Sequence, residues 1–244
     1  MSHLIIPDWP APAGVHALVT TRQGGASTGP WVSFNLASHV GDDAAAVSAN
    51  RAQLRRSLPA DPPWLMQVHG TRCVDAALAP SGIEADASFT RQRGVVCAVL
   101  TADCLPVLLC DDDASVVSAV HAGWRGLADG VIETSVAAIQ TPGERLMAWL
   151  GPAIGPTAFE VGAEVRDVFL AQDMQAAHAF TPVATDKWLC DIYLLARQRL
   201  QALNIRRITS ADFPGYCTVR DIDRFYSFRR DGITGRMASC IWLE

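Results

Sequence analysis

Residues 95–126 read VVCAVLTADCLPVLLCDDDASVVSAVHAGWRG, and this stretch predicts the centre of a β-sheet. Three short apolar runs in it have the length and composition of buried strands: Val95–Leu100, Pro106–Leu109 and Val116–Val120. The aspartates of Asp111–Asp113 favour a turn, so the second and third runs should form an antiparallel hairpin. That hairpin would bring Cys104 and His121 to the same end of the sheet.

Strands and helices are mixed along the rest of the chain. Further strands are expected at Val15–Thr20, at Leu146–Leu150 and around Arg207–Ile208. Helical spacing occurs at Ala44–Leu58, Gly130–Gln140, Ala163–Gln172 and Asp191–Leu203. Asp191 is the expected N-cap of the last helix, and Asn204 its stop. The order is not a regular strand–helix alternation, and no linker or repeat divides residues 1–244, so we expect one α/β (α+β) domain.

Composition narrows the class of partner. The 244 residues are half hydrophobic, carry a net charge of −5 and contain no basic tract, which excludes an electrostatic surface for nucleic acid or membranes. No signal peptide and no apolar run of about 18 residues is present, so a cytoplasmic protein is expected. The seven cysteines lie mostly in apolar runs, as reduced thiols do. A small-molecule ligand fits this composition best.

Cys104, His121 and His69 are the best candidate metal ligands. One thiolate and two imidazoles form the kind of set that holds a catalytic zinc with a fourth position open. Taken alone, Cys104 would be a buried core cysteine and His69 an exposed loop histidine. Asp103 beside Cys104, and the hairpin that brings His121 near, favour the metal site. Copper could occupy the same three ligands.

Arginines supply the candidate anion ligands. Arg125 lies between two glycines before a helix expected over Leu127–Ile139, where a helix N-terminus would help it to bind phosphate. Arg22 and Arg229 each adjoin a glycine-rich loop. Any one of these, or Arg51, taken alone would be an ordinary surface charge.

Several motifs together resemble one known family, that of the multicopper polyphenol oxidases, or laccase-domain proteins, now regarded as purine nucleoside phosphorylases. The motifs span almost the whole chain: Thr20–Gly25, Asn35–Leu36, His39–Asp43, Gln67–Gly70, Thr101–Pro106, His121–Gly126, Gly151–Pro156 and Tyr226–Asp231. The resemblance implies a single domain of packed mixed sheets with outer helices, a Cys/His hydrolase-like fold. It also implies zinc at His69, Cys104 and His121, and phosphorolysis of adenosine, inosine, guanosine and methylthioadenosine, with some adenosine deaminase activity.

The sequence also bears on the reaction. A laccase needs paired His-x-His motifs for a trinuclear copper cluster, and six histidines without such a pair argue against true multicopper oxidation. Phosphorolysis needs a phosphate site, for which Arg22, Arg51, Arg125 and Arg229 are candidates, and a group acting on the base, for which His69, Cys104 and His121 are candidates. Deamination would need a separate acid or base, for which Asp103 is the candidate.

Two other classes remain open from the residues. In a metal-free hydrolase, His121 would activate Cys104 as a nucleophile. A non-enzymatic nucleoside sensor would bind without turnover. The expected partners are purine nucleosides and phosphate, and the expected assembly is a monomer or weak homo-oligomer.

Overall fold

The expected hairpin is the middle of the larger sheet. The computed structural model describes residues 4–210 and 215–244. Strands β6 (Leu105–Asp111) and β7 (Val117–Ala122) pair antiparallel, with Pro106 opposite His121. The turn between them follows Asp111, as the aspartate run predicts. Cys104 and His121 therefore lie at the same end of the hairpin, and this prediction is confirmed.

The six-stranded sheet has the order β12-β8-β6-β7-β4-β3. Its other members are β3 (Cys73–Asp75), β4 (Ala87–Thr90), β8 (Leu146–Leu150) and β12 (Arg207–Ser210). The central pairs are antiparallel, while β12 with β8 and β3 with β4 run parallel. The sheet is therefore mixed, in agreement with the expected fold class.

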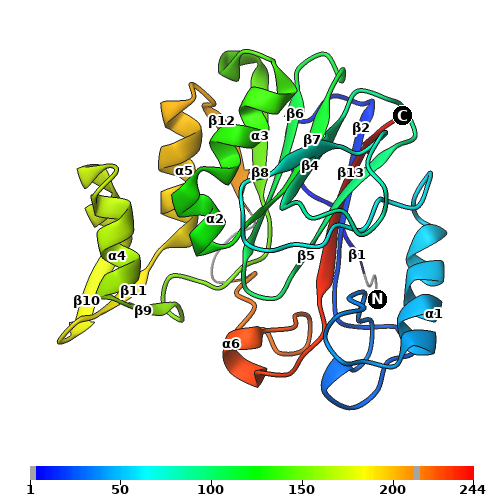
Figure 1. Ribbon diagram of the computed structural model, residues 1–244, viewed down its shortest axis with the longest axis horizontal. Helices are drawn as coiled ribbons and strands as arrows, with labels where there is room; N and C mark the ends of the chain where they lie inside the picture. Colours follow the sequence, from blue (N-terminus) through cyan, green and yellow to red (C-terminus); the bar gives the residue numbers. More distant parts are fainter. Residues whose placement is uncertain (1–3, 211–214) are drawn as a thin grey trace.

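A four-stranded antiparallel sheet packs against one face of this sheet (Figure 1). Its strands are β1 (Leu4–Ile5), β2 (Val15–Thr20), β5 (Val96–Thr101) and β13 (Met237–Leu243). The core between the sheets contains Val19, Val99 and Ile241 from one side and Leu108 and Trp149 from the other, all buried. No strand was expected at 237–243, yet β13 lies between β2 and β5 and pairs with both.

Helices lie around the strands (Figure 1). They are α1 (Ala44–Arg55), α2 (Trp124–Asp129), α3 (Val131–Ile139), α4 (Ala163–Leu170), α5 (Ile192–Ala202) and α6 (Phe228–Asp231), with 3-10 turns η1 (Gly29–Trp31), η2 (Gly143–Arg145) and η3 (Met174–Ala179). The Asp191 side chain caps α5 by accepting from the backbone N–H of Leu194, as predicted. The single helix expected over Leu127–Ile139 is wrong, because Gly130 adopts a left-handed φ of 97° and divides it into α2 and α3.

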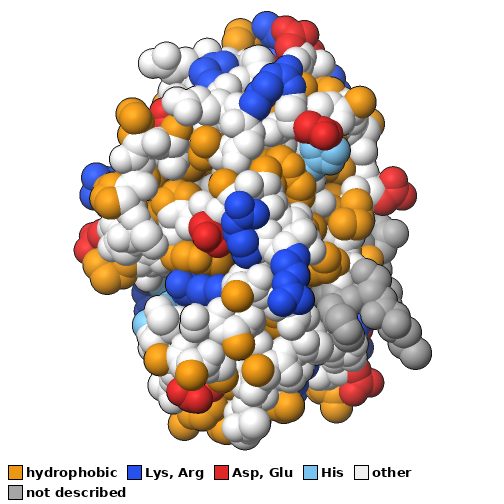
Figure 2. Space-filling model, turned by 90° about the vertical axis from the view of Figure 1, so that its right-hand side faces the viewer, with side chains coloured by type: hydrophobic (Ala, Val, Ile, Leu, Met, Phe, Trp, Pro, Cys, Tyr) orange, Lys and Arg blue, Asp and Glu red, His pale blue; other side chains and the backbone are white. Residues whose placement is uncertain are grey.

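A third, three-stranded sheet projects beside α4 at the left of Figure 1. It consists of β9 (Glu160–Gly162), β10 (Phe180–Ala184) and β11 (Lys187–Cys190) in antiparallel pairs. No helix within the described ranges is long and apolar enough to cross a membrane. On the face drawn in Figure 2, basic side chains are interspersed with acidic and apolar ones, without a continuous basic stripe.

Candidate active site

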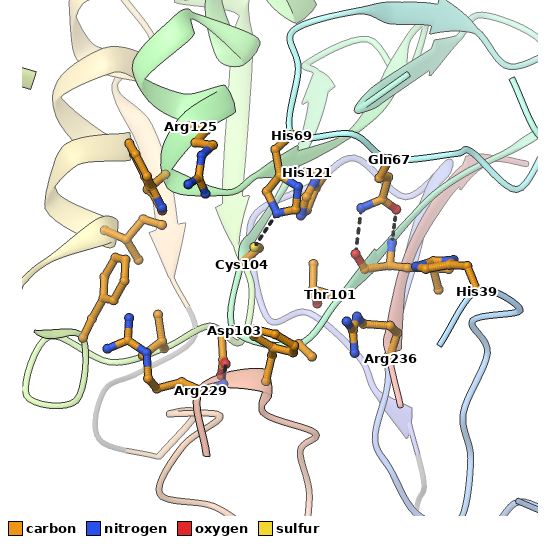
Figure 3. A pocket seen from close by; sticks show the side chains of 17 residues that line it. His39, Gln67, His69, Thr101, Asp103, Cys104, His121, Arg125, Arg229 and Arg236 are labelled. Atoms are coloured by element: carbon orange, nitrogen blue, oxygen red, sulfur yellow. Dashed lines mark hydrogen bonds between the residues drawn. The ribbon is translucent and has the colours of Figure 1, made fainter. Parts of the chain in front are cut away.

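Three donor side chains converge from three separate segments (Figure 3). Cys104 lies in the turn between β5 and β6, His121 lies in β7, and His69 lies in the loop before β3. Their donor atoms lie within 4.8 Å of one another. The Sγ atom of Cys104 is 3.6 Å from Nε2 of His69, and the two imidazole rings meet edge to face with centroids 4.8 Å apart. The structure thus brings together all three predicted metal ligands.

Asp86, which the sequence analysis did not identify, holds two of these ligands in place. It is fully buried, and its Oδ1 lies 2.8 Å from Nδ1 of His121 in a hydrogen bond. The same carboxylate accepts the backbone N–H groups of Val68, His69 and Gly70 at 2.8–3.1 Å. A carboxylate behind a metal-binding imidazole fixes the orientation and tautomer of the ring. One side chain therefore orients His121 and also fixes the loop that carries His69.

Cys104, His121 and Asp86 stabilise one another's charged forms. Burial opposes ionisation of Cys104, but His121 and His69 outweigh it and lower the pKa of the thiol to about 6. Burial likewise opposes protonation of His121, but Cys104 and Asp86 raise its pKa to about 9. Despite burial, the hydrogen bonds from His121 and the loop amides hold the pKa of Asp86 below its usual value. A thiolate is therefore the stable form of Cys104.

Five other cysteines differ from Cys104 in the direction in which their thiol pKa is shifted. Burial raises the thiol pKa at five positions: Cys73, Cys97, Cys110, Cys190 and Cys240. These residues behave as core thiols, which is the alternative that the sequence left open for Cys104.

The donor set fits a metal ion. Since Nδ1 of His121 is bound to Asp86, its Nε2 is the nitrogen left for a ligand. Together with His69 and the thiolate of Cys104 it forms a three-ligand set suited to zinc. Within the described ranges, this is the one group of three or more His, Cys, Asp or Glu residues that could hold a metal.

Asp103 binds protein groups with both carboxylate oxygens. Oδ1 accepts from the hydroxyl of Thr218, and Oδ2 accepts from the backbone N–H of Arg229, each at 2.6 Å. The backbone of Asp103 has a left-handed φ of 94°, and its carbonyl accepts from the N–H of Ile154. These contacts fix the sharp turn that presents Cys104. The acid–base role expected for Asp103 stays a prediction.

The predicted arginines do not all face the same space. Arg125 and Arg229 line a cavity of about 430 Å³ that also contains the three metal-ligand candidates. Arg236 lines it as well, and the sequence analysis did not identify it. The walls include seven apolar side chains: Leu100, Ala102, Trp124, Ile154, Phe159, Ile192 and Phe228. A mostly apolar hollow with a few converging polar groups is typical of a small-molecule site.

Arg22 and Arg51 lie outside the lining of this cavity. Arg22 lies at a separate hollow, where its guanidinium donates to the carbonyls of Val32 and Ile222 at 3.1 Å. Arg51 donates to the carbonyl of Leu36 at 2.9 Å and stacks on Trp64, with its guanidinium carbon 4.3 Å from the ring centroid. Adjacency to a glycine-rich loop was therefore a poor guide to which arginines face the site.

The chain is similar in sequence to a known protein family and to named proteins of other bacteria. Residues 16–244 match the model of a family described as multi-copper polyphenol oxidoreductase laccase. A purine nucleoside phosphorylase of Pseudomonas aeruginosa is 51% identical, and the purine nucleoside phosphorylase YfiH of Escherichia coli K12 is 50% identical. Both alignments cover 100% of this chain and 100% of the relative.

Solved structures agree with this placement. A Neisseria meningitidis protein is 47% identical and superposes with a TM-score of 0.95, covering 100% of both chains. The protein YlmD of Geobacillus stearothermophilus is 30% identical with a TM-score of 0.84, covering 95% of this chain and 93% of that one. The chain belongs to the multi-copper polyphenol oxidoreductase laccase family.

Proposed function

We propose that this protein is a purine nucleoside phosphorylase. The observation that carries the proposal is the position of the His69, Cys104 and His121 group inside a cavity that also has arginines and apolar walls. Phosphorolysis needs these three features: a group acting at the reacting bond, cations for phosphate, and a surface for the base. Relatives about half identical over their full length carry this name.

The reaction sets the demands on these side chains. An oxygen of inorganic phosphate bonds to the anomeric carbon of the ribose, and the bond from that carbon to the purine nitrogen breaks. Its electron pair leaves with the purine, which takes up a proton. At least one arginine of the cavity would bind the phosphate, and the apolar walls would hold the purine and exclude water, which would otherwise hydrolyse the nucleoside.

His69, Cys104 and His121 would hold one metal ion, with zinc as the proposed ion and copper as the alternative. When bound, the ion supplies a Lewis acid beside the nucleoside. The contribution of Asp86 is to hold the His121 ring and the His69 loop in place before substrate arrives. Such preorganisation avoids rearrangement of the site during the reaction.

The proposed substrates are adenosine, inosine, guanosine and methylthioadenosine, with adenosine deamination as a secondary reaction. The proposed assembly is a monomer or weak homo-oligomer. Multicopper oxidation has less support, because the six histidines include no His-x-His pair and the described residues contain one candidate metal group. That group would hold a single copper rather than a trinuclear cluster.

The test is base release from inosine by metal-loaded protein. We expect free hypoxanthine and ribose 1-phosphate, formed only when phosphate is present, as measured by chromatography of the products. His121→Ala should lower the rate by about 100-fold or more, the scale for losing one preorganised stabiliser. His178→Ala is the matched control, since that exposed histidine lies outside the cavity.

Three results would contradict the proposal. Base release at the same rate without phosphate would assign a hydrolase. Phenol oxidation restored by copper, with no base release from any purine nucleoside, would assign an oxidase. Nucleoside binding without turnover would assign a sensor.

A further inference from the structure

The two ends of the cavity have different chemistry. Arg236 and His39 line one end, and Arg125 and Arg229 line the other, with the metal-ligand group between them (Figure 3). Both ends are cationic, so net charge alone does not say which one binds an anion. None of the three arginines forms an ion pair among the described residues, but Arg236 is half-buried whereas Arg125 and Arg229 are exposed. Burial and the contacts of each guanidinium distinguish the ends.

The guanidinium of Arg236 is held by backbone carbonyl groups. Its Nη1 donates to the carbonyls of Thr234 and Gly235 at 3.0 and 2.9 Å, and its backbone N–H donates to Oδ1 of Asn35 at 2.9 Å. None of the ion pairs among the described residues includes Arg236. A half-buried guanidinium without a directly paired carboxylate is costly unless a ligand supplies negative charge in contact with it.

A histidine and a second arginine lie close to Arg236. His39 lines the same end, and Arg51 lies behind it, held by the carbonyl of Leu36 and the face of Trp64. Burial and then the positive charges of Arg236 and Arg51 lower the pKa of His39, which agrees with the three groups being neighbours. Neither His39 nor Arg51 forms an ion pair among the described residues. Cys104 and Asp103 act on Arg236 only through space, so no carboxylate among the described residues pairs directly with the cations of this end.

At the opposite end the arginines lie closer to aromatic rings than Arg236 does, whose guanidinium carbon is 5.9 Å from the Phe228 centroid. The guanidinium of Arg125 lies 4.4 Å from the Trp124 ring centroid, and that of Arg229 lies 5.4 Å from the Phe159 centroid. Arg229 also donates to the carbonyl of Glu160 at 2.8 Å. Planar groups stacked on indole and phenyl faces create a surface for a flat heteroaromatic ring rather than a cradle for a tetrahedral anion.

We propose that the end formed by Arg236 and His39 is the anion subsite, that it binds inorganic phosphate, and that the purine occupies the end formed by Trp124 and Phe159. This assignment rests on the proposed function. Phosphate attacks the anomeric carbon from the side opposite the departing base, so nucleophile and base belong at opposite ends of the cavity. The metal-ligand group lies between them, beside the reacting bond.

Steady-state kinetics of the metal-loaded enzyme with inosine and phosphate test the assignment. Arg236→Gln should raise the KM for phosphate by about 10- to 100-fold, as expected for one lost charge-assisted hydrogen bond, and leave the KM for inosine within about threefold. Arg125→Gln is the matched control, with the same chemical change at the other end. It should raise the KM for inosine more than that for phosphate.

His39→Asn keeps the assignment testable if Arg236→Gln does not fold, because His39 is exposed and makes no described hydrogen bond. It should also raise the KM for phosphate without affecting that for inosine. An unchanged phosphate KM in His39→Asn and Arg236→Gln, with an increase in Arg125→Gln, would overturn the subsite and leave the phosphorylase proposal intact.

Direct calorimetry with inorganic phosphate separates the subsite from the reaction. If the wild-type protein shows no phosphorolysis, the proposed function fails, yet phosphate binding lost in Arg236→Gln and kept in Arg125→Gln would still uphold an anion site at this end. Phosphate binding that survives both arginine variants and disappears in Cys104→Ala would assign the anion to the metal ion and overturn the subsite.

Discussion

The metal-ligand candidates come from two regions that are held in different ways. Cys104 and His121 adjoin paired strands, where Leu105 lies opposite Ala122 and Pro106 lies opposite His121. His69 is exposed, belongs to a loop rather than a strand, and has a left-handed φ of 61°. Backbone pairing therefore positions the first two donors, whereas contacts of a loop position the third.

Two features hold the His69 loop against the hairpin. One is Asp86, which accepts three consecutive backbone N–H groups of the loop. The other is the absence of a side chain at the start of α2, where a Cβ on Gly123 would lie 2.7 Å from Cδ2 of His69 and 3.1 Å from Sγ of Cys104. The third donor therefore depends on a buried carboxylate and on a close approach at Gly123, both of which single substitutions can alter.

The largest effect is expected from the hairpin side. Cys104→Ala removes the only thiolate of the set, and two imidazoles do not make a three-ligand zinc site. Zinc content, measured by atomic emission after purification, should fall from about one ion per chain to near zero. Cys73→Ala, a change at a core cysteine outside the cavity, should retain the metal. Full zinc and normal activity in Cys104→Ala would return Cys104 to the core thiols.

A smaller effect is expected from Asp86→Asn, which keeps the size of the side chain but removes its charge. Metal affinity should fall by about 10- to 100-fold, the range for losing a carboxylate behind a metal-binding histidine. Competition with a chelator measures the affinity, and the visible spectrum of the cobalt-substituted protein reports the altered ligand geometry. The control is Asp112→Asn, which removes a carboxylate at the far end of the hairpin, where it pairs with Arg145.

An unchanged cobalt spectrum in Asp86→Asn, with only a lower melting temperature, would mean that Asp86 stabilises the fold without positioning the ligands. Asp86 would then not be what positions the His69 loop against the hairpin.

Local patterns predicted the hairpin and its two donors because the interactions involved are close in sequence. Strand-length runs, an aspartate turn and the Asp191 cap each act over a few residues. β13 has strand length too, but its partners β2 and β5 lie more than 100 residues earlier in the chain, so nothing nearby marks it as a central strand.

The sequence did not point to Asp86 or Arg236 for the same reason: their roles depend on contacts between residues far apart in the chain. Asp86 is one of many acidic residues, and only the fold reveals that its carboxylate is buried behind His121. Arg236 directly follows Gly235 and Arg22 adjoins a glycine-rich loop, yet Arg236 faces the cavity and Arg22 does not. Side-chain direction in loops is set by tertiary contacts such as those of Thr218 with Asp103, which lie 115 residues apart.

The smallest effect is expected from Gly123→Ala, which leaves every donor in place. The backbone at Gly123 has a φ of −65°, so alanine is compatible with its conformation and the added methyl group alone is tested. Because it would press on His69 and Cys104, the loop should shift and metal affinity should fall by about tenfold or less, within the range of overpacking by one methyl group. Gly14→Ala is the control, since its Cβ would meet only Ala114 at an ordinary 3.4 Å. Chelator competition at equal folding, checked by circular dichroism, compares the two variants. Equal metal affinity in both would show that the His69 loop has room to adjust, and that Asp86 alone holds the third donor against the hairpin.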